Sequence, residues 1–182
     1  MKATNSDKSI IAGKALDRHF DLFNTLIAFS KLFSYNNGDD RSIVIIGATF
    51  LETILEHILL GFFPEDEKDV DSLLKYDLGS YGKKVKMTYC LGLIEKTVKD
   101  DLVLIGRIRN RFAHDLYASF EDENIKAWCN QLKWHEISMM MAPPGEATTR
   151  DIYQVGVNQL ITNLNGVVSF ARGEKRIILN NF

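Results

Sequence analysis

Cysteine is scarce in this sequence, and the usual motifs of metal and cofactor sites are absent from it. The 182 residues include only Cys90 and Cys129, with no C-x-x-C pair and no cysteine–histidine cluster. This pattern argues against a disulfide framework and against a structural zinc site. His19, His57 and His135 lie in separate predicted elements without metal-ligand spacing, and no glycine-rich loop is followed by lysine and serine or threonine. We therefore expect no metal ion and no cofactor.

Proline is almost as rare, since Pro64, Pro143 and Pro144 are the only three. The long segments between them carry apolar residues at helical rather than alternating spacing. The prediction is an all-α, single-domain bundle of six or seven helices over residues 1–182. The expected helices cover about 9–33, 41–63, a short stretch within 78–93, 99–116, 121–135 and 150–171. An acidic, exposed connection is expected at 64–71, a break at 142–149, and a short tail at 173–182 that forms either a strand or coil.

A large excess of one charge and a long uninterrupted apolar run are also lacking. The formal net charge is −2, so the chain has no global basic signature of a nucleic-acid-binding protein. Apolar residues make up 46% and charged residues 25%, which excludes a disordered or collagen-like chain. The N-terminus shows no secretory signal, and Glu52, Glu56 and His57 make the apolar stretch 43–63 a poor membrane span. We expect a soluble, cytoplasmic protein.

The segment 41–63 is apolar around most of a helical wheel, which predicts the central helix of the bundle. Its polar residues gather in one stripe that includes Glu52 and Glu56, which are four residues apart and share a face. Two interpretations stay open at this point. The stripe either reaches solvent or faces another helix that supplies cations.

The helix predicted at 99–116 carries the most informative polar residues. On a wheel of about 100° per residue, Arg109 falls within the apolar arc of this helix. Because an unpaired guanidinium in a core costs several kcal/mol, a buried arginine needs an acidic partner. We therefore expect a structural ion pair between Arg109 and Glu52 or Glu56.

The opposite face of that helix presents a group of hydrogen-bond donors able to hold an anion or a protein partner: Arg107, Asn110, Arg111 and His114. His114 could also exchange protons, since an imidazole changes charge near neutral pH. Three interpretations are open: a solvated basic face on which His114 pairs locally with Asp115, recognition of an anion or protein, and catalysis.

A second basic cluster, formed by Lys83, Lys84 and Lys86, stands at the start of the short helix within 78–93. We interpret it as a solvated face. It would extend an anion site if the helix at 99–116 lay alongside.

Four sequence features occur in a recognisable order between residues 42 and 132. They are LETILEHILL at 51–60, LGSYGKKVKMTYCLGLI at 78–94, IRNRFAHD at 108–115 and SFEDENIKAWCNQL at 119–132. In this order the segment resembles the mannitol operon repressor family of bacterial regulators. The resemblance implies an all-helical, repressor-like regulator that has no DNA-binding motif of its own and acts through protein partners. The sequence agrees, because it contains no helix-turn-helix with a basic second helix.

The stretch Arg109–His114, RNRFAH, also matches the R-N-x-x-x-H signature of HEPN (higher eukaryote and prokaryote nucleotide-binding) helical domains. Catalytic members of that family are usually dimers that cleave RNA without a metal ion. The resemblance implies a phosphate or transition-state contact for Arg109, a positioning role for Asn110, and an acid–base or orienting role for His114. Arg109 and His114 lie about 140° apart on an ideal helix, so one chain cannot direct both at one phosphate unless the helix ends or bends near Phe112.

The sequence as a whole favours a regulator resembling the mannitol operon repressor family, with no catalytic residue. We expect a protein partner, no direct DNA binding and no membrane contact. The alternative is a metal-independent HEPN-type endoribonuclease or toxin-like domain that uses Arg109, Asn110 and His114 across a homodimer, and only this alternative involves RNA. A plain scaffold, in which RNRFAH serves helix packing, is a third interpretation.

Overall fold

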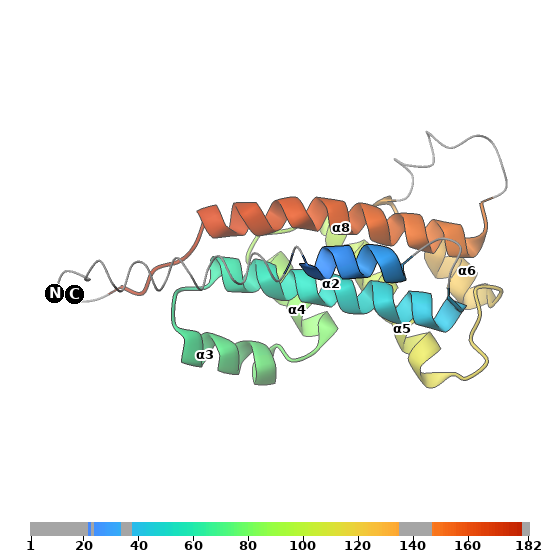
Figure 1. Ribbon diagram of the computed structural model, residues 1–182, viewed down its shortest axis with the longest axis horizontal. Helices are drawn as coiled ribbons and strands as arrows, with labels where there is room; N and C mark the ends of the chain where they lie inside the picture. Colours follow the sequence, from blue (N-terminus) through green and yellow to red (C-terminus); the bar gives the residue numbers. More distant parts are fainter. Residues whose placement is uncertain (1–21, 23, 34–37, 135–146, 180–182) are drawn as a thin grey trace.

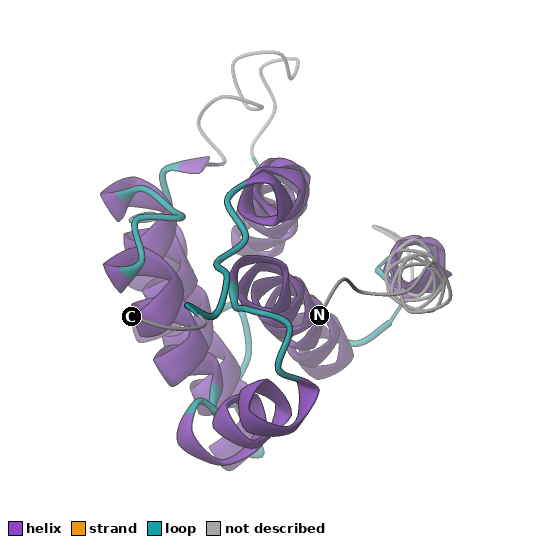
Figure 2. Ribbon diagram, turned by 90° about the vertical axis from the view of Figure 1, so that its left-hand side faces the viewer, coloured by secondary structure: helices purple, strands orange, loops and turns teal. Residues whose placement is uncertain are grey.

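The described part of the chain consists of helices and the loops between them (Figures 1 and 2). The computed structural model describes residues 22, 24–33, 38–134 and 147–179, and no strand occurs within these ranges. Its elements are α2 (Asp40–Phe62), α3 (Glu67–Ser72), a π-helical turn (Leu73–Asp77), α4 (Tyr81–Cys90), α5 (Lys96–His114), α6 (Glu123–Cys129) and α8 (Thr149–Gly173). Residues 24–32 are also helical. The predictions of an all-helical fold and of one central apolar helix are confirmed.

Helix α2 is the centre of the bundle, and its ends follow from local chemistry. At its start the Asp39 carboxylate accepts a hydrogen bond from the Ser42 amide at 3.0 Å, an N-cap arrangement. At its end Pro64 disfavours helical backbone at Phe63, and Phe63 is extended. Helix α8 lies alongside α2 (Figure 1), while α4 and α5 pack on its other sides. Its buried residues are Ile43, Val44, Gly47, Ala48, Phe50, Leu51, Ile54, Leu55, Ile58, Leu59, Gly61 and Phe62.

Helices α2 and α8 approach closely because a glycine lies between them. A Cβ atom added at Gly47 would lie 3.0 Å from the Phe33 ring and 3.3 Å from the Tyr153 hydroxyl. The Tyr153 hydroxyl donates to the Val44 carbonyl at 3.0 Å, so this buried polar group is satisfied. Helix α8 starts with a capping box between Thr148 and Asp151.

Helices α4 and α5 also meet at a glycine. Ser80 stands at the N-cap of α4, and Gly92, with a φ of 72°, follows its end. A Cβ atom added at Gly106 of α5 would lie only 3.0 Å from the Tyr81 ring, so the two helices could not pack this closely with a larger residue there. The Tyr81 hydroxyl donates to the Leu102 carbonyl at 3.0 Å, which ties the first turn of α4 to α5.

The helix predicted at 121–135 is shorter than expected, because α6 ends at Cys129. The reason is a buried carboxylate on α5. Asp101, 1% exposed, accepts hydrogen bonds from the Lys133 amide at 2.9 Å and from the Trp134 amide at 2.9 Å. Those two amides are therefore not available to continue α6.

The acidic connection predicted at 64–71 contains most of α3, and the π-helical turn follows it. The predicted tail has no helix or strand at 174–179. Arg176 holds this tail to the end of α2, because its amide donates to the Phe62 carbonyl at 2.8 Å and its guanidinium covers the Phe62 ring. Of the predicted helix 9–33, only residues 22 and 24–33 are described. The predicted break at 142–149 lies outside the described residues up to position 146.

One helix in the described ranges, α2, is long and apolar enough to span a membrane by length and composition. More than half of its most apolar window is buried inside the bundle. Such burial is typical of the core helix of a soluble protein.

Candidate functional site

The acidic stripe of α2 is neutralised by Lys84 of α4. The Lys84 ammonium lies 3.0 Å from Glu52 Oε1 and 3.1 Å from Glu56 Oε2. Lys84 is only 6% exposed, so the prediction that it belongs to a solvated basic face is wrong. Burial alone lowers the pKa of Lys84, but the hydrogen bonds to Glu52 and Glu56 outweigh this effect and raise the pKa above its ordinary value.

The expected ion pair between Arg109 and Glu52 or Glu56 does not form. The Arg109 side chain is half-buried, and its Nη1 atom donates to the side-chain oxygen of its neighbour Asn110 at 3.0 Å. Among the described residues, no carboxylate forms a salt bridge with Arg109. The physical reason is the position of α4, which places Lys84 against both glutamates. The long apolar stem of Arg109 carries its guanidinium out of the apolar arc of α5.

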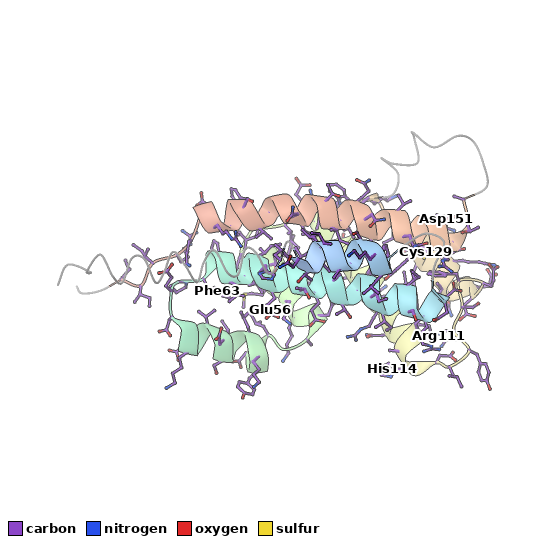
Figure 3. The ribbon with its side chains drawn as sticks, viewed as in Figure 1. Glu56, Phe63, Arg111, His114, Cys129 and Asp151 are labelled. Atoms are coloured by element: carbon purple, nitrogen blue, oxygen red, sulfur yellow. The ribbon has the colours of Figure 1, made fainter. Side chains whose placement is uncertain are left out.

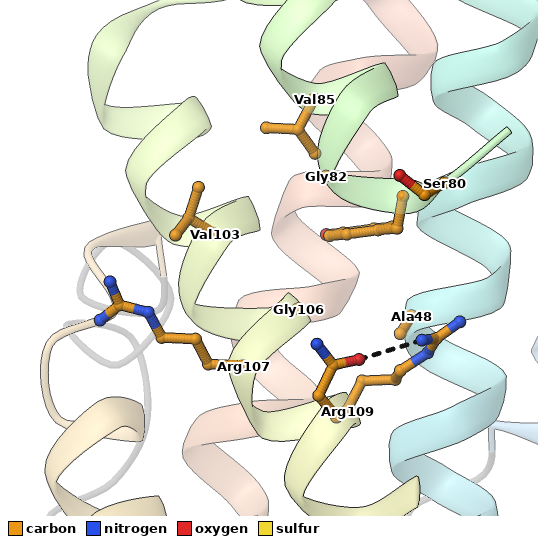
Figure 4. Close-up of a pocket in the computed structure, with 10 residues that line it drawn as sticks. Ala48, Ser80, Gly82, Val85, Val103, Gly106, Arg107 and Arg109 are labelled. Atoms are coloured by element: carbon orange, nitrogen blue, oxygen red, sulfur yellow. Dashed lines mark hydrogen bonds between the residues drawn. The ribbon is translucent and has the colours of Figure 1, made fainter. Parts of the chain in front are cut away.

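Arg109 instead lines an open pocket between α2, α4 and α5, with a volume of about 360 Å³ (Figure 4). Its walls combine apolar groups with the first turn of α4, and none of the described residues that line it is acidic. The lining residues are Ala48, Ser80, Tyr81, Gly82, Val85, Val103, Gly106, Arg107, Arg109 and Asn110. Figure 4 shows the Arg109 guanidinium directed toward α2, whereas Arg107 extends on the other side of α5.

Electrostatics in this pocket favour a negative group. The Ser80 side chain caps no amide, and the first amides of a helix have no acceptor within the helix. Burial raises the pKa of Tyr81, and the charge of Glu52 adds to this effect while that of Arg109 opposes it. The Tyr81 phenol therefore stays neutral, and Arg109 is left as the charged group directed to the α2 side of the pocket.

His114 is the last residue of α5, and its side chain is exposed. Figure 3 places it beside Arg111, at the end of the molecule opposite Phe63. Arg111 is tied to the following loop through salt bridges to Asp115 at 2.9 Å and Asp122 at 3.8 Å. The predicted face of Arg107, Asn110, Arg111 and His114 is therefore divided. Asn110 joins Arg109 at the pocket, and Arg111 and His114 belong to the end of the helix.

Sequence reasoning missed Arg41, which binds the end of α5 from the first turn of α2. Its guanidinium donates to the carbonyls of Phe112, Asp115 at 2.8 Å and Leu116 at 2.9 Å. These residues are 71 to 75 positions away in the sequence, and no local pattern points to such a contact.

Within the described residues, no group of three or more histidine, cysteine, aspartate or glutamate side chains is placed to hold a metal ion. Comparison of the chain with protein-family models, with curated proteins and with solved structures gave no match.

Proposed function

We propose that this protein binds RNA at the pocket formed by α4 and α5 and cleaves it without a metal ion, as a homodimer. The observation that carries the proposal is the state of Arg109. Within the described ranges, its guanidinium has no carboxylate partner, and the pocket that it lines has no acidic residue in its walls. This arrangement fits the role that the HEPN resemblance assigns to Arg109 and not the structural ion pair that favoured a regulator.

A guanidinium in this setting suits a phosphate oxygen. Its planar array of donors matches phosphate geometry and keeps its charge at any physiological pH. Asn110 is held beside it by the 3.0 Å hydrogen bond to its side-chain oxygen, and the side-chain N–H groups of an asparagine can donate to a further acceptor. The first turn of α4 adds partial positive charge from the same side.

The proposed reaction needs only proton transfer and stabilisation of charge. The ribose 2′-oxygen attacks the adjacent phosphorus and gives its proton to a base, while the bond from phosphorus to the 5′-oxygen breaks and that oxygen takes a proton. The products are a 2′,3′-cyclic phosphate and a 5′-hydroxyl. His114 supplies the proton-transfer group, and Arg109 stabilises the charge that develops on the phosphate.

A dimer follows from the direction of the two side chains. His114 is five residues after Arg109 on one continuous helix, so the two side chains diverge by about 140°. One phosphate would therefore contact Arg109 of one chain and His114 of the second copy. The protein would act in the cytoplasm, where RNA is accessible to it.

Complementation between inactive variants tests this proposal. Purified Arg109→Ala and His114→Ala proteins are each expected to be inactive on RNA in the presence of EDTA. If they are mixed under conditions of subunit exchange, half of the dimers carry one intact site, and about one quarter of the wild-type activity returns. His57→Ala and Arg176→Ala are controls that should keep full activity. Cleavage that persists in His114→Ala, or mixtures that stay inactive although subunits exchange, would contradict the proposal.

A regulator that acts through a protein partner is the second candidate. The observation that favours it is the loop after α5, where Leu116 is 78% exposed and Tyr117 is 88% exposed. Exposed aromatic and aliphatic side chains of this kind are typical of protein interfaces. RNA sequencing of cells that express the wild type, His114→Ala or the Leu116→Ser/Tyr117→Ser double variant separates the two functions. Transcript changes that survive His114→Ala and vanish in the double variant would favour the regulator.

A further inference from the structure

The C-terminal end of α5 is held from outside the helix. The last four carbonyl groups of any α-helix have no N–H donor within the helix. In α5 the Asp115 amide satisfies the Arg111 carbonyl at 3.0 Å, and Asp115 itself is extended. No glycine follows to form the usual left-handed cap. The end of α5 therefore depends on a donor from elsewhere.

Arg41 is that donor. Its single guanidinium binds the carbonyls of Phe112, Asp115 and Leu116, which lie on both sides of His114 in the sequence. A cation at this position also interacts favourably with the negative end of the helix dipole. Only a branched, planar group can donate in several fixed directions, so lysine would not reproduce the contact.

The first turn of α2, which carries Arg41, is itself held in place. Asp39 caps the first turn of α2, and Arg150 of α8 binds the same turn through the Asp40 carboxylate at 3.1 Å and the Gly38 carbonyl at 3.0 Å. The start of α2 is thereby fixed to α8. Because Arg41 starts from this fixed turn, its hydrogen bonds also fix the backbone around His114.

We infer that Arg41 is a positioning residue for His114: it holds the backbone from Phe112 to Leu116 and so sets where the imidazole stands. This inference rests on the proposed function, in which His114 transfers protons. Arg41 touches no group of the pocket at Arg109, so its loss is expected to impair the chemical step and not the binding of the substrate phosphate.

Steady-state and single-turnover cleavage of a short RNA by the full-length protein tests the inference. Arg41→Ala is expected to lower kcat by about 10- to 100-fold, the range seen for small misplacements of catalytic groups, with KM changed less than about twofold. Arg41→Lys should recover only part of this loss, and added ethylguanidinium should restore activity to Arg41→Ala. Arg176→Ala is the control. It removes an arginine at the opposite end of α2, where its guanidinium covers the Phe62 ring, so kcat should stay within about twofold of the wild type.

Hydrogen exchange gives a readout that does not depend on cleavage. The amides of Asp115, Tyr117 and Ala118 are hydrogen-bonded within this segment, so they should exchange faster in Arg41→Ala and keep their wild-type rates in Arg176→Ala. If the wild type does not cleave RNA, the proposed function fails while this measurement still tests the anchor. Unchanged exchange, or a kcat loss no larger than in Arg176→Ala, would overturn the inference.

Discussion

Replacement of Lys84 by methionine tests how the acidic stripe of α2 is stabilised. Methionine keeps most of the length of the side chain and its unbranched apolar stem, but it removes the charge that lies between Glu52 and Glu56. The two carboxylates, which share one face of the central helix, then repel each other without a cation nearby. We therefore expect a less stable protein with an unchanged fold.

The magnitude follows from the exposure of the three side chains. Removing one partner of a fully buried ion pair costs about 3–5 kcal/mol. The Lys84 side chain is 8% exposed, but Glu52 is 23% and Glu56 is 45% exposed, so water stabilises the carboxylates that remain. We expect Lys84→Met to lower the free energy of unfolding by about 2–3 kcal/mol, which lowers Tm by about 5–10 °C for a chain of this size.

Urea unfolding at pH 7, followed by circular dichroism, measures this loss. The matched control is Lys83→Met, since Lys83 is an exposed neighbour on the same helix and its loss should change stability by less than about 0.5 kcal/mol. The double variant Lys84→Met/Glu52→Gln should be more stable than the sum of the single effects predicts, because the repulsion between the two carboxylates is gone. A neutral Lys84→Met, or strict additivity in the double variant, would refute the reasoning.

The pH dependence has a definite sign. The pKa of Lys84 is raised in the folded protein above its ordinary value of 10.5. Its ionic contribution to stability is therefore fully present below pH 10.5 and is lost as pH rises through the higher folded value. The stability difference between the wild type and Lys84→Met should stay constant from pH 7 to 9 and shrink above pH 10.5.

Three further predictions concern other sites. Gln154→Leu should raise the free energy of unfolding by about 1 kcal/mol in urea titrations, because the fully buried Nε2 atom of Gln154 has no hydrogen-bond partner among the described residues. Gly106→Ala should destabilise the protein by about 1–3 kcal/mol in thermal unfolding, since its Cβ would lie 3.0 Å from the Tyr81 ring; an unchanged Tm would show that the ring moves freely. If RNA binds as proposed, Arg109→Ala should reduce the slope of log affinity against log salt by about 0.7, as expected for one lost phosphate contact in single-stranded nucleic acid, and an unchanged slope would remove Arg109 from the phosphate site.

The candidate site could be predicted only in part, and the errors share one cause. A helical wheel correctly places Glu52 and Glu56 on one face and shows that this face needs a cation. It cannot show which neighbouring helix lies against that face, because that depends on how the helices pack. Lys84 and Arg109 both carry the positive charge that this face needs. Lys84 forms the ion pairs because α4 packs against α2 there. Arg109 was thereby left for the pocket.

The helices and most of their ends could be predicted from the order of the residues, because they depend on interactions within a few residues. The scarcity of proline, the apolar spacing of α2, the cap at Asp39 and the glycine after α4 all act locally. Which charges meet, and what holds the end of α5, depend on the packing of the helices in the folded protein. The contacts of Arg41 join residues more than 70 positions apart, and the early end of α6 depends on Asp101 of another helix. Such contacts leave no periodic trace in a sequence, since they arise from the way whole helices pack in three dimensions.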